Sequence, residues 1–328
     1  MDFLTKLKIL WALYDVQTIY FPVLAAFGVP VNVVTIAILS RGKCGLSKCV
    51  TRYLVAMALA DLLVVIIDLV LRQIPIVYRE QFIFFRNVAL CNVHAVFLYA
   101  ATDCSVWFTV TFTLDRCVAI CCQNLKSKYC TAKTADVVLG TVTVVSLLKN
   151  IFWYFLYTTE YWLSNSSWFC RVDFSVTRSM AWAVVELMHY ILTPFIPFVL
   201  ILLFNALTVR YILMASKARS RLRNQSHGAS ASDPEIENRR KSIMLLFIIS
   251  GNFIFLWVVF MVCSILKRLD YLRYSVPMPM FLREIGFMLQ LLSCCTNTFI
   301  YAVTQRKFRE EFLLGVKRPL KMMAKLVH

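Results

Sequence analysis

The sequence predicts an all-α membrane protein: a seven-transmembrane helix bundle followed by a short amphipathic eighth helix. Of the 328 residues, 60% are hydrophobic and 16% are charged, whereas a soluble domain has about 45–50% apolar and about 25% charged residues. The apolar residues gather in seven runs of roughly 20 or more residues, enough for a helix to cross about 30 Å of hydrocarbon. Helices are expected because open strands leave backbone groups unsatisfied in lipid, and the alternating pattern of a membrane β-barrel is absent.

The seven runs place one membrane domain at residues 20–303. Residues 1–19 are expected to form an outer N-terminal segment, and residues 304–328 the eighth helix and a short tail. Met1–Tyr20 lacks a small-residue cleavage site, so the first span is expected to serve as a signal anchor. The spans are predicted at Tyr20–Leu39, Thr51–Leu71, Cys91–Ile120, Thr134–Phe155, Ala181–Arg210, Ser242–Leu266 and Met280–Val303. The eighth helix is predicted at Gln305–Leu314, where basic residues alternate with Phe308 and Phe312.

The basic residues behind the net charge of +17 cluster on one face of the predicted bundle. They follow the first, third and seventh spans and fill Lys217–Lys241 between the fifth and sixth, whereas the opposite loops mix both signs. The positive-inside rule then places the N-terminus outside the cell and the C-terminus in the cytoplasm. This arrangement favours a lipid bilayer as the partner and argues against nucleic acid.

Two of the twelve cysteines, Cys91 and Cys170, are predicted to face outside. A disulfide between them would join the top of the third span to the loop after the fourth; two unpaired thiols are the alternative. Asn165 begins an Asn-Ser-Ser glycosylation sequon in the same loop. The four histidines are scattered over both faces, so no metal site is expected.

Polar residues inside the spans suggest an ion site. Asp61 in the second span, Ser105 in the third, and Ser293 and Asn297 in the seventh could together line a pocket for a hydrated Na⁺ ion. A protonated Asp61 that is hydrogen-bonded to neighbouring helices explains the same residues equally well. Both interpretations remain open at the level of sequence.

Several motifs occur in a fixed order along these spans. They are Asn32, Asp61, Cys91 with Cys170, Asp115-Arg116-Cys117, Pro197, Phe253 with Trp257, Asn297-Thr298-Phe299-Ile300-Tyr301 and Phe308. In this order the chain resembles the class A (rhodopsin-like) G-protein-coupled receptors over nearly its full length. Val31–Ile36 and Leu203–Val209 are further similar to orphan receptors that group with peptide receptors and include aromatic amino-acid responders.

The resemblance implies a cell-surface receptor in the plasma membrane that binds an extracellular ligand and activates heterotrimeric G proteins. It implies no enzyme activity, and the chain has no Gly-rich phosphate loop. The coupling switch would comprise Asp115, Arg116, Asn297, Tyr301 and Asn205. The activation core would comprise Pro197, Val106, Phe253 and Trp257. Arrestin, if recruited, would depend on Ser216–Ser232, since the tail Lys317–His328 has no Ser or Thr.

The resemblance also places a ligand pocket at the outer end of the bundle. Its expected residues are Arg72, Leu98, Tyr99, Thr102, Glu186, His189, Trp257, Phe260, Ser264, Phe287 and Gln290. Leu98 stands where amine receptors carry an aspartate, which argues against a biogenic amine. Arg72, Glu186 and Arg283 would instead hold the charges of a peptide or amino-acid-like ligand. The alternatives are that Glu186 and Arg283 mark the membrane edge and that His189 is structural.

The chain departs from the family pattern at several helix-bending and locking positions. Arg239 stands where many members carry a carboxylate that locks Arg116, so raised basal activity is expected. Val259 and Thr298 replace prolines of the sixth and seventh spans, which leaves Gly251 as a candidate bend. A receptor-fold protein that couples weakly or constitutively is therefore the near alternative. A transporter or channel would need a continuous polar path or inverted repeats, and neither is evident.

Overall fold

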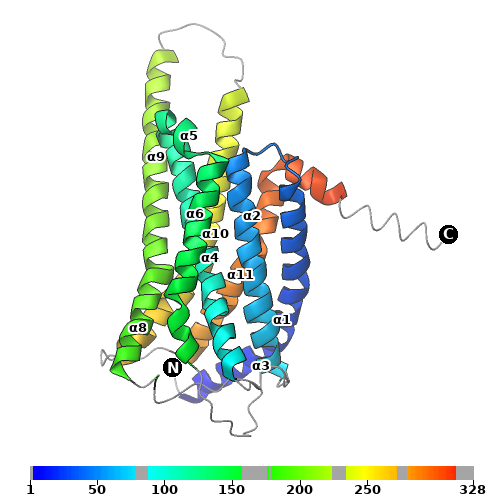
Figure 1. Ribbon diagram of the computed structural model, residues 1–328, viewed down its shortest axis with the longest axis vertical. Helices are drawn as coiled ribbons and strands as arrows, with labels where there is room; N and C mark the ends of the chain where they lie inside the picture. The colour runs from blue at the N-terminus through cyan, green and yellow to red at the C-terminus, as the bar shows by residue number, and fades with distance from the viewer. Residues whose placement is uncertain are drawn as a thin grey trace, which may run out of the picture.

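The computed structural model describes residues 3–78, 88–156, 176, 179–223, 234–271 and 279–314. All regular structure in these segments is helical, and seven of the helices are long and apolar enough to cross a membrane. This confirms the predicted seven-helix bundle. The helices run side by side along one long axis, and the short helix 306–314 lies at the end where α1 finishes (Figure 1).

The seven spans are made of single or compound helices. The first three are α1 (Phe3–Ser40), α2 (Lys48–Val64) continued by the π-helical η1 (Val65–Gln73) and by α3 (Ile74–Tyr78), and α4 (Val88–Cys121). The fourth is α6 (Ala132–Lys149) with the 3₁₀ segment η3 (Ile151–Phe155), and α5 (Gln123–Tyr129) precedes it. The last three are α8 (Met180–Tyr190), η4 (Ile191–Phe195) and α9 (Ile196–Arg223); α10 (Pro234–Tyr271); and α11 (Met280–Thr304).

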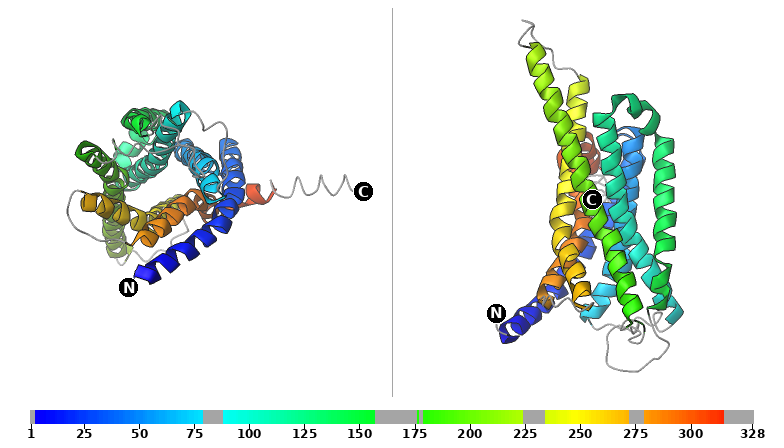
Figure 2. Two further views of the ribbon diagram at one scale, coloured as in Figure 1. Left: turned by 90° about the horizontal axis from the view of Figure 1, so that it is seen from below. Right: turned by 90° about the vertical axis from the view of Figure 1, so that its left-hand side faces the viewer.

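The first helix is longer than hydropathy predicts, since α1 begins at Phe3 and not at Tyr20. No glycine or proline interrupts the chain before Pro22, so helix-forming residues carry the helix past the apolar run. The additional turns lie on the α11 side of the bundle, where Gln17 Nε2 donates to Glu284 Oε2 at 3.4 Å (Figure 2). The segment expected to be a simple outer terminus is therefore part of the bundle wall.

Irregular backbone occurs in the second and fifth spans and not in the sixth. η1 and η4 are π-helical, and Thr193 inside η4 has non-helical backbone angles. The sixth span, α10, is one continuous helix through Gly251, where an added Cβ would meet nothing within 4 Å. The α-helical backbone thus continues through Gly251 in this conformation.

α10 and α11 approach each other closely at Gly286. A Cβ added there would lie 2.7 Å from the backbone nitrogen of Phe260, a distance that no side chain can occupy without moving a helix. Glycine at this position lets the outer halves of α10 and α11 pack backbone to backbone. The two helices therefore form one fixed wall of the cavity described below.

Residues 306–314 form the short helix predicted after the seventh span. Phe308 is fully buried, and its ring centroid lies 5.9 Å from that of Tyr301 and 6.3 Å from that of Phe312. These contacts attach the short helix to a core cluster that also contains Tyr53, Phe112 and Leu245. The amphipathic pattern seen in the sequence thus corresponds to an apolar face packed on the bundle.

Candidate ligand cavity and coupling site

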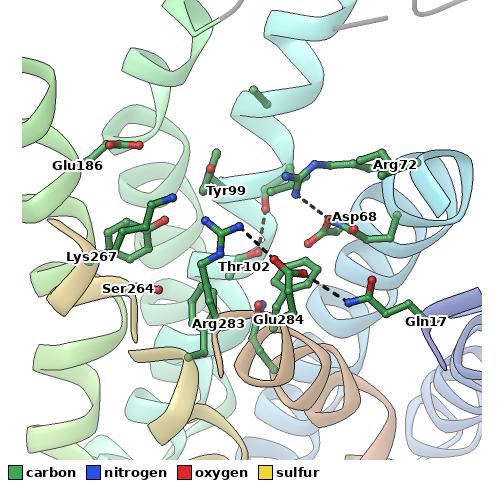
Figure 3. A pocket seen from close by; sticks show the side chains of 18 of the residues that line it. Gln17, Asp68, Arg72, Tyr99, Thr102, Glu186, Ser264, Lys267, Arg283 and Glu284 are labelled. Carbon is green, nitrogen blue, oxygen red and sulfur yellow. Dashed lines mark hydrogen bonds and ion pairs between the residues drawn. The ribbon is translucent and has the colours of Figure 1, made fainter. Parts of the chain in front are cut away.

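A cavity of about 1110 Å³ opens at the end of the bundle where α11 begins (Figure 3). Every residue assigned to a ligand pocket from the sequence lines it. These residues are Arg72, Leu98, Tyr99, Thr102, Glu186, His189, Trp257, Phe260, Ser264, Phe287 and Gln290. The size suits a drug-sized or peptide-like group. The binding of a ligand there stays a prediction.

Aromatic rings cover the deeper wall of the cavity. Phe260 lies edge to face on Trp257, with centroids 5.8 Å apart, and 6.3 Å from Phe287. On the opposite wall Tyr99 stacks on Trp153 at 3.7 Å, and the buried His189 meets both rings edge-on. The packing of His189 agrees with its structural interpretation. The cavity therefore offers apolar contact on two sides.

Six of the charged residues that line the cavity form three ion pairs within the protein. The pairs are Arg72–Asp68 at 3.1 Å, Arg268–Glu186 at 2.9 Å and Arg283–Glu284 at 3.0 Å. Arg72, Glu186 and Arg283 are expected to hold ligand charges, and in the structure each is bound to another side chain of the protein. The Asp68–Arg72 spacing of four residues is a helical signal that sequence reasoning missed. Nothing in the sequence pairs Glu186 with Arg268.

The extended start of α1 supplies a wall that the sequence did not suggest. Trp11, Tyr14 and Gln17 line the cavity from this helix. Tyr78 at the end of α3 donates its hydroxyl to the backbone oxygen of Thr18 at 2.7 Å, which attaches the helix to the second span. A ligand entering the cavity would therefore pass the side chains of α1.

The polar residues around Asp61 come together only in part. Ser105 Oγ donates to Asp61 Oδ1 at 2.6 Å, and Asn297 Nδ2 donates to Oδ2 at 2.7 Å. Ser293 instead donates to the backbone oxygen of Gln290 and accepts from Trp257 Nε1 at 2.9 Å. Asp61 is buried, and each of its carboxylate oxygens accepts a hydrogen bond from a protein side chain. Ser293 is bound instead to Trp257, which lines the cavity.

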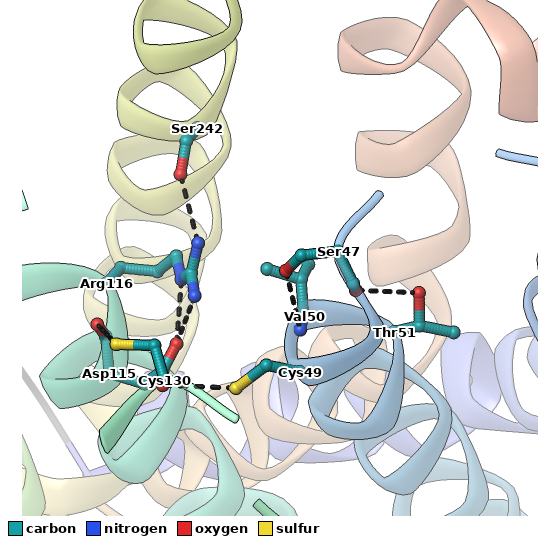
Figure 4. Close-up of polar contacts among 8 residues, drawn as sticks. All are labelled: Ser47, Cys49, Val50, Thr51, Asp115, Arg116, Cys130 and Ser242. Carbon is teal, nitrogen blue, oxygen red and sulfur yellow. Dashed lines mark hydrogen bonds and ion pairs between the residues drawn. The ribbon is translucent and has the colours of Figure 1, made fainter. Parts of the chain in front are cut away.

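Arg116 is buried at the opposite end of the bundle beside Asp115 (Figure 4). Its Nε donates to Asp115 Oδ2 at 2.9 Å, and its Nη1 donates to Ser242 Oγ on α10 at 3.4 Å. Asp115 Oδ1 also accepts from the Cys49 thiol at 3.2 Å. The expected pairing of Asp115 with Arg116 is present, whereas its contacts to Cys49 and Ser242 were not anticipated.

A second cavity, of about 850 Å³, opens beside Arg116. Its lining includes Lys126, Arg306 and Lys307, and no acidic side chain is among the described residues that line it. A basic hollow of this size at the end of a helix bundle can accept a helix with acidic or carboxylate groups.

Within the described part of the chain, the other residues assigned to the coupling switch form no hydrogen bond with Arg116. Asn205 Oδ1 accepts from Ser250 Oγ at 3.3 Å, which joins α9 to α10. The Tyr301 hydroxyl is buried and has no hydrogen-bond partner within the described part of the chain.

Three of the four residues expected in the activation core belong to one buried cluster. Val106, Phe253 and Trp257 pack together with Ile201, and the rings of Phe253 and Trp257 stack at 5.3 Å. Pro197 is buried in the first turn of α9 beside this cluster's helix. Trp257 of this cluster lines the cavity, and Ser242 on the same helix α10 contacts Arg116. Movement of α10 would therefore change contacts at the cavity and at Arg116.

The described cysteines include one in a disulfide and others that are free thiols. Cys91 is disulfide-bonded, while Cys170, its predicted partner, and the sequon at Asn165 lie outside the described residues. Near Arg116, burial raises the pKa of the Cys130 thiol to about 11, with the Asp115 carboxylate adding to the effect. Burial likewise raises the pKa of Cys44. These thiols stay protonated at neutral pH.

Comparison with known proteins decides the class. The family model for the 7 transmembrane receptor (rhodopsin family) matches residues 31–301. The chain belongs to this receptor family. The receptor is also 26% identical over 297 residues to the 5-hydroxytryptamine receptor 4 of Rattus norvegicus, covering 82% of this chain and 68% of the relative. The same identity and coverage of this chain hold for the Cavia porcellus receptor, with 71% of that relative covered.

Membership of the family settles the coarse function. The receptor is a multi-pass plasma-membrane protein that binds an extracellular ligand and couples to G proteins, and it is not an enzyme. Among the described residues no group of three His, Cys, Asp or Glu side chains could hold a metal ion.

Proposed function

We propose that the receptor binds a peptide or amino-acid-like ligand in the outer cavity, with its N-terminus outside the cell and its C-terminus in the cytoplasm. The observation that carries this proposal is the cavity of about 1110 Å³ with aromatic walls and charged side chains of both signs. Its relatives are named as 5-hydroxytryptamine receptors. Leu98, which lines this cavity, cannot supply a carboxylate to an amine.

In this proposal the ligand shifts the population between two states of the bundle. Trp257 and Phe253 connect the cavity floor to the inner half of α10. Outward movement of α10 would break the weak Arg116–Ser242 contact and widen the basic hollow. A helix of the G-protein α-subunit would then dock beside Arg116.

The test is nucleotide exchange on several purified G proteins, with aromatic amino acids and short peptides screened against the purified receptor. At least one compound is expected to accelerate exchange in the wild type. The Arg116→Ala variant should bind that compound but fail to accelerate exchange. A screen in which only amines act would overturn the ligand assignment and leave the receptor class intact.

A receptor that couples weakly or constitutively is the second candidate function. The contact from Arg116 to α10 is a single 3.4 Å hydrogen bond to the neutral Ser242, and this favours the second candidate. Second-messenger output without ligand should then exceed that of mock-transfected cells at equal surface expression. Output equal to mock would remove this candidate. Arrestin recruitment through Ser216–Ser232 is a further proposal, tested by replacing the serines of that range with alanine.

We also propose that Asp61 holds a Na⁺ ion together with Ser105 and Asn297. Carboxylate, hydroxyl and amide oxygens suit this hard cation, and both side chains already lie within hydrogen-bonding distance of Asp61. NaCl should stabilise the purified receptor more than choline chloride does, and Asp61→Asn should abolish the difference. Equal unfolding temperatures in the two salts would support a protonated Asp61 instead.

A further inference from the structure

Lys267 has no hydrogen bond or ion pair with any residue that the structure describes. It is half-buried near the outer end of α10 and lines the cavity, with its amino group directed inward in Figure 3. The other basic residues of the cavity, Arg72, Arg268 and Arg283, each bind a carboxylate. Lys267 therefore differs from its neighbours in having an unused charge.

The charges around Lys267 leave one positive charge uncompensated. Arg268, Arg283, Glu186 and Glu284 are the charged groups within its electrostatic reach. The two carboxylates are already bound by the two arginines. A partly buried ammonium that lacks a counter-ion has lost hydration without gaining an ion pair. A carboxylate on a ligand would supply that ion pair.

The cavity also offers aromatic side chains from α10 and α11. Phe260 and Phe287 line the same cavity and provide apolar contact.

We propose that Lys267 anchors a ligand carboxylate, and that the ligand is the C-terminal aromatic residue of a peptide or an N-acyl aromatic amino acid. Such a group carries a carboxylate for Lys267 and a ring for Phe260 and Phe287, and its amide bond removes the ammonium that would otherwise lie beside Lys267. The inference rests on the proposed function and names the chemistry of its ligand. A cationic ligand fits poorly because it brings a like charge next to Lys267.

The experiment measures binding to the purified receptor in nanodiscs by thermal shift, without G protein. The probes are N-acetyl-L-phenylalanine, its C-terminal amide and phenethylamine. The acid should stabilise the wild type, and the amide and the amine should not. Lys267→Gln should weaken binding of the acid about tenfold or more, the effect expected for loss of one charge-assisted hydrogen bond. Lys267→Arg should retain most of the affinity.

Lys8→Gln is the matched control, because it removes one positive charge from the exposed start of α1. Its affinity for the acid should equal that of the wild type. The proposal is overturned if no probe stabilises the wild type, if acid and amide bind equally, or if Lys267→Gln, with an unchanged unliganded unfolding temperature, binds the acid normally. Because no G protein is present, these outcomes say nothing against coupling, which the exchange assay tests separately.

Discussion

At the scale of single residues, Arg116 is held by two contacts of unequal strength. The bond to Asp115 joins two opposite charges in a buried site, whereas the bond to Ser242 on α10 joins a cation to a neutral hydroxyl at 3.4 Å. Opposite charges add Coulomb attraction to the hydrogen bond, and 3.4 Å is longer than the roughly 2.7–3.2 Å of a normal N–H···O bond. The contact that joins Arg116 to α10 is therefore the weaker one.

Ser242→Glu should lower ligand-free signalling. A glutamate at this position would place a carboxylate near Arg116 and add an ion pair across α4 and α10 in the closed state. An ion pair of about 1 kcal/mol corresponds to roughly a fivefold change in the active fraction. Second-messenger output at matched surface expression measures it. Ser242→Gln is the uncharged control, and equal output from both variants would show that charge is not the cause.

The sequence predicted only the local part of this site. Asp115 and Arg116 are adjacent, so their pairing follows from the motif itself. Cys49 and Ser242 lie 66 and 126 residues away from their partners. Such contacts depend on how helices are rotated within the bundle, and no periodic pattern in the chain encodes that rotation.

At the scale of helices, a buried ion pair joins α4 to α6. Lys149 Nζ lies 2.6 Å from Asp103 Oδ2 and donates to Thr193 Oγ1 in η4 at 3.0 Å. Asn150 Nδ2 donates to the same carboxylate oxygen at 2.6 Å. The Asp103–Lys149 pair thereby connects three spans, with Lys149 making the contact to Thr193. Neither Asp103 nor Lys149 was predicted as a site residue from the sequence.

Lys149→Met should destabilise the purified receptor by about 3–5 kcal/mol, because it leaves the Asp103 carboxylate buried without its cation. The double variant Asp103→Leu/Lys149→Met should recover much of that loss, since it removes both charges together. Thermal unfolding of the two variants measures the difference. If the double variant were as unstable as the sum of two independent losses, the residues would not act as a pair.

The α10–α11 contact gives a second prediction at this scale. Gly286→Ala should destabilise the receptor by about 1–3 kcal/mol, because the added methyl meets the backbone of Phe260 and forces the helices apart. Gly251→Ala is the matched control within α10, where the methyl meets nothing. It should be neutral or stabilising by up to about 1 kcal/mol. A larger loss at Gly251 than at Gly286 would contradict this account of the packing.

Over the whole molecule, features that depend on the composition of long segments could be predicted from the sequence. Features that depend on which side chains meet in the folded bundle could not. Seven spans follow from apolar runs, since each run must satisfy its own backbone in lipid. The cavity lining followed from the family resemblance, which assigns pocket positions along each span. The extension of α1 to Phe3 was not predicted, because residues with good helix propensity continue on the N-terminal side of the apolar run. The ion pairs of Arg72, Glu186 and Arg283 could not be foreseen, since their partners depend on side-chain direction in the folded bundle.

The distribution of charge over the whole molecule predicts its orientation in the membrane. Lys126, Arg306 and Lys307 gather around the hollow beside Arg116, and basic residues follow the first, third and seventh spans. The positive-inside rule assigns this end to the cytoplasm, so the larger cavity opens to the extracellular side. An epitope at the N-terminus should be labelled by antibody on intact cells, and one after His328 only after permeabilisation. Labelling of the C-terminal epitope on intact cells would place the ligand cavity on the wrong side for an extracellular ligand.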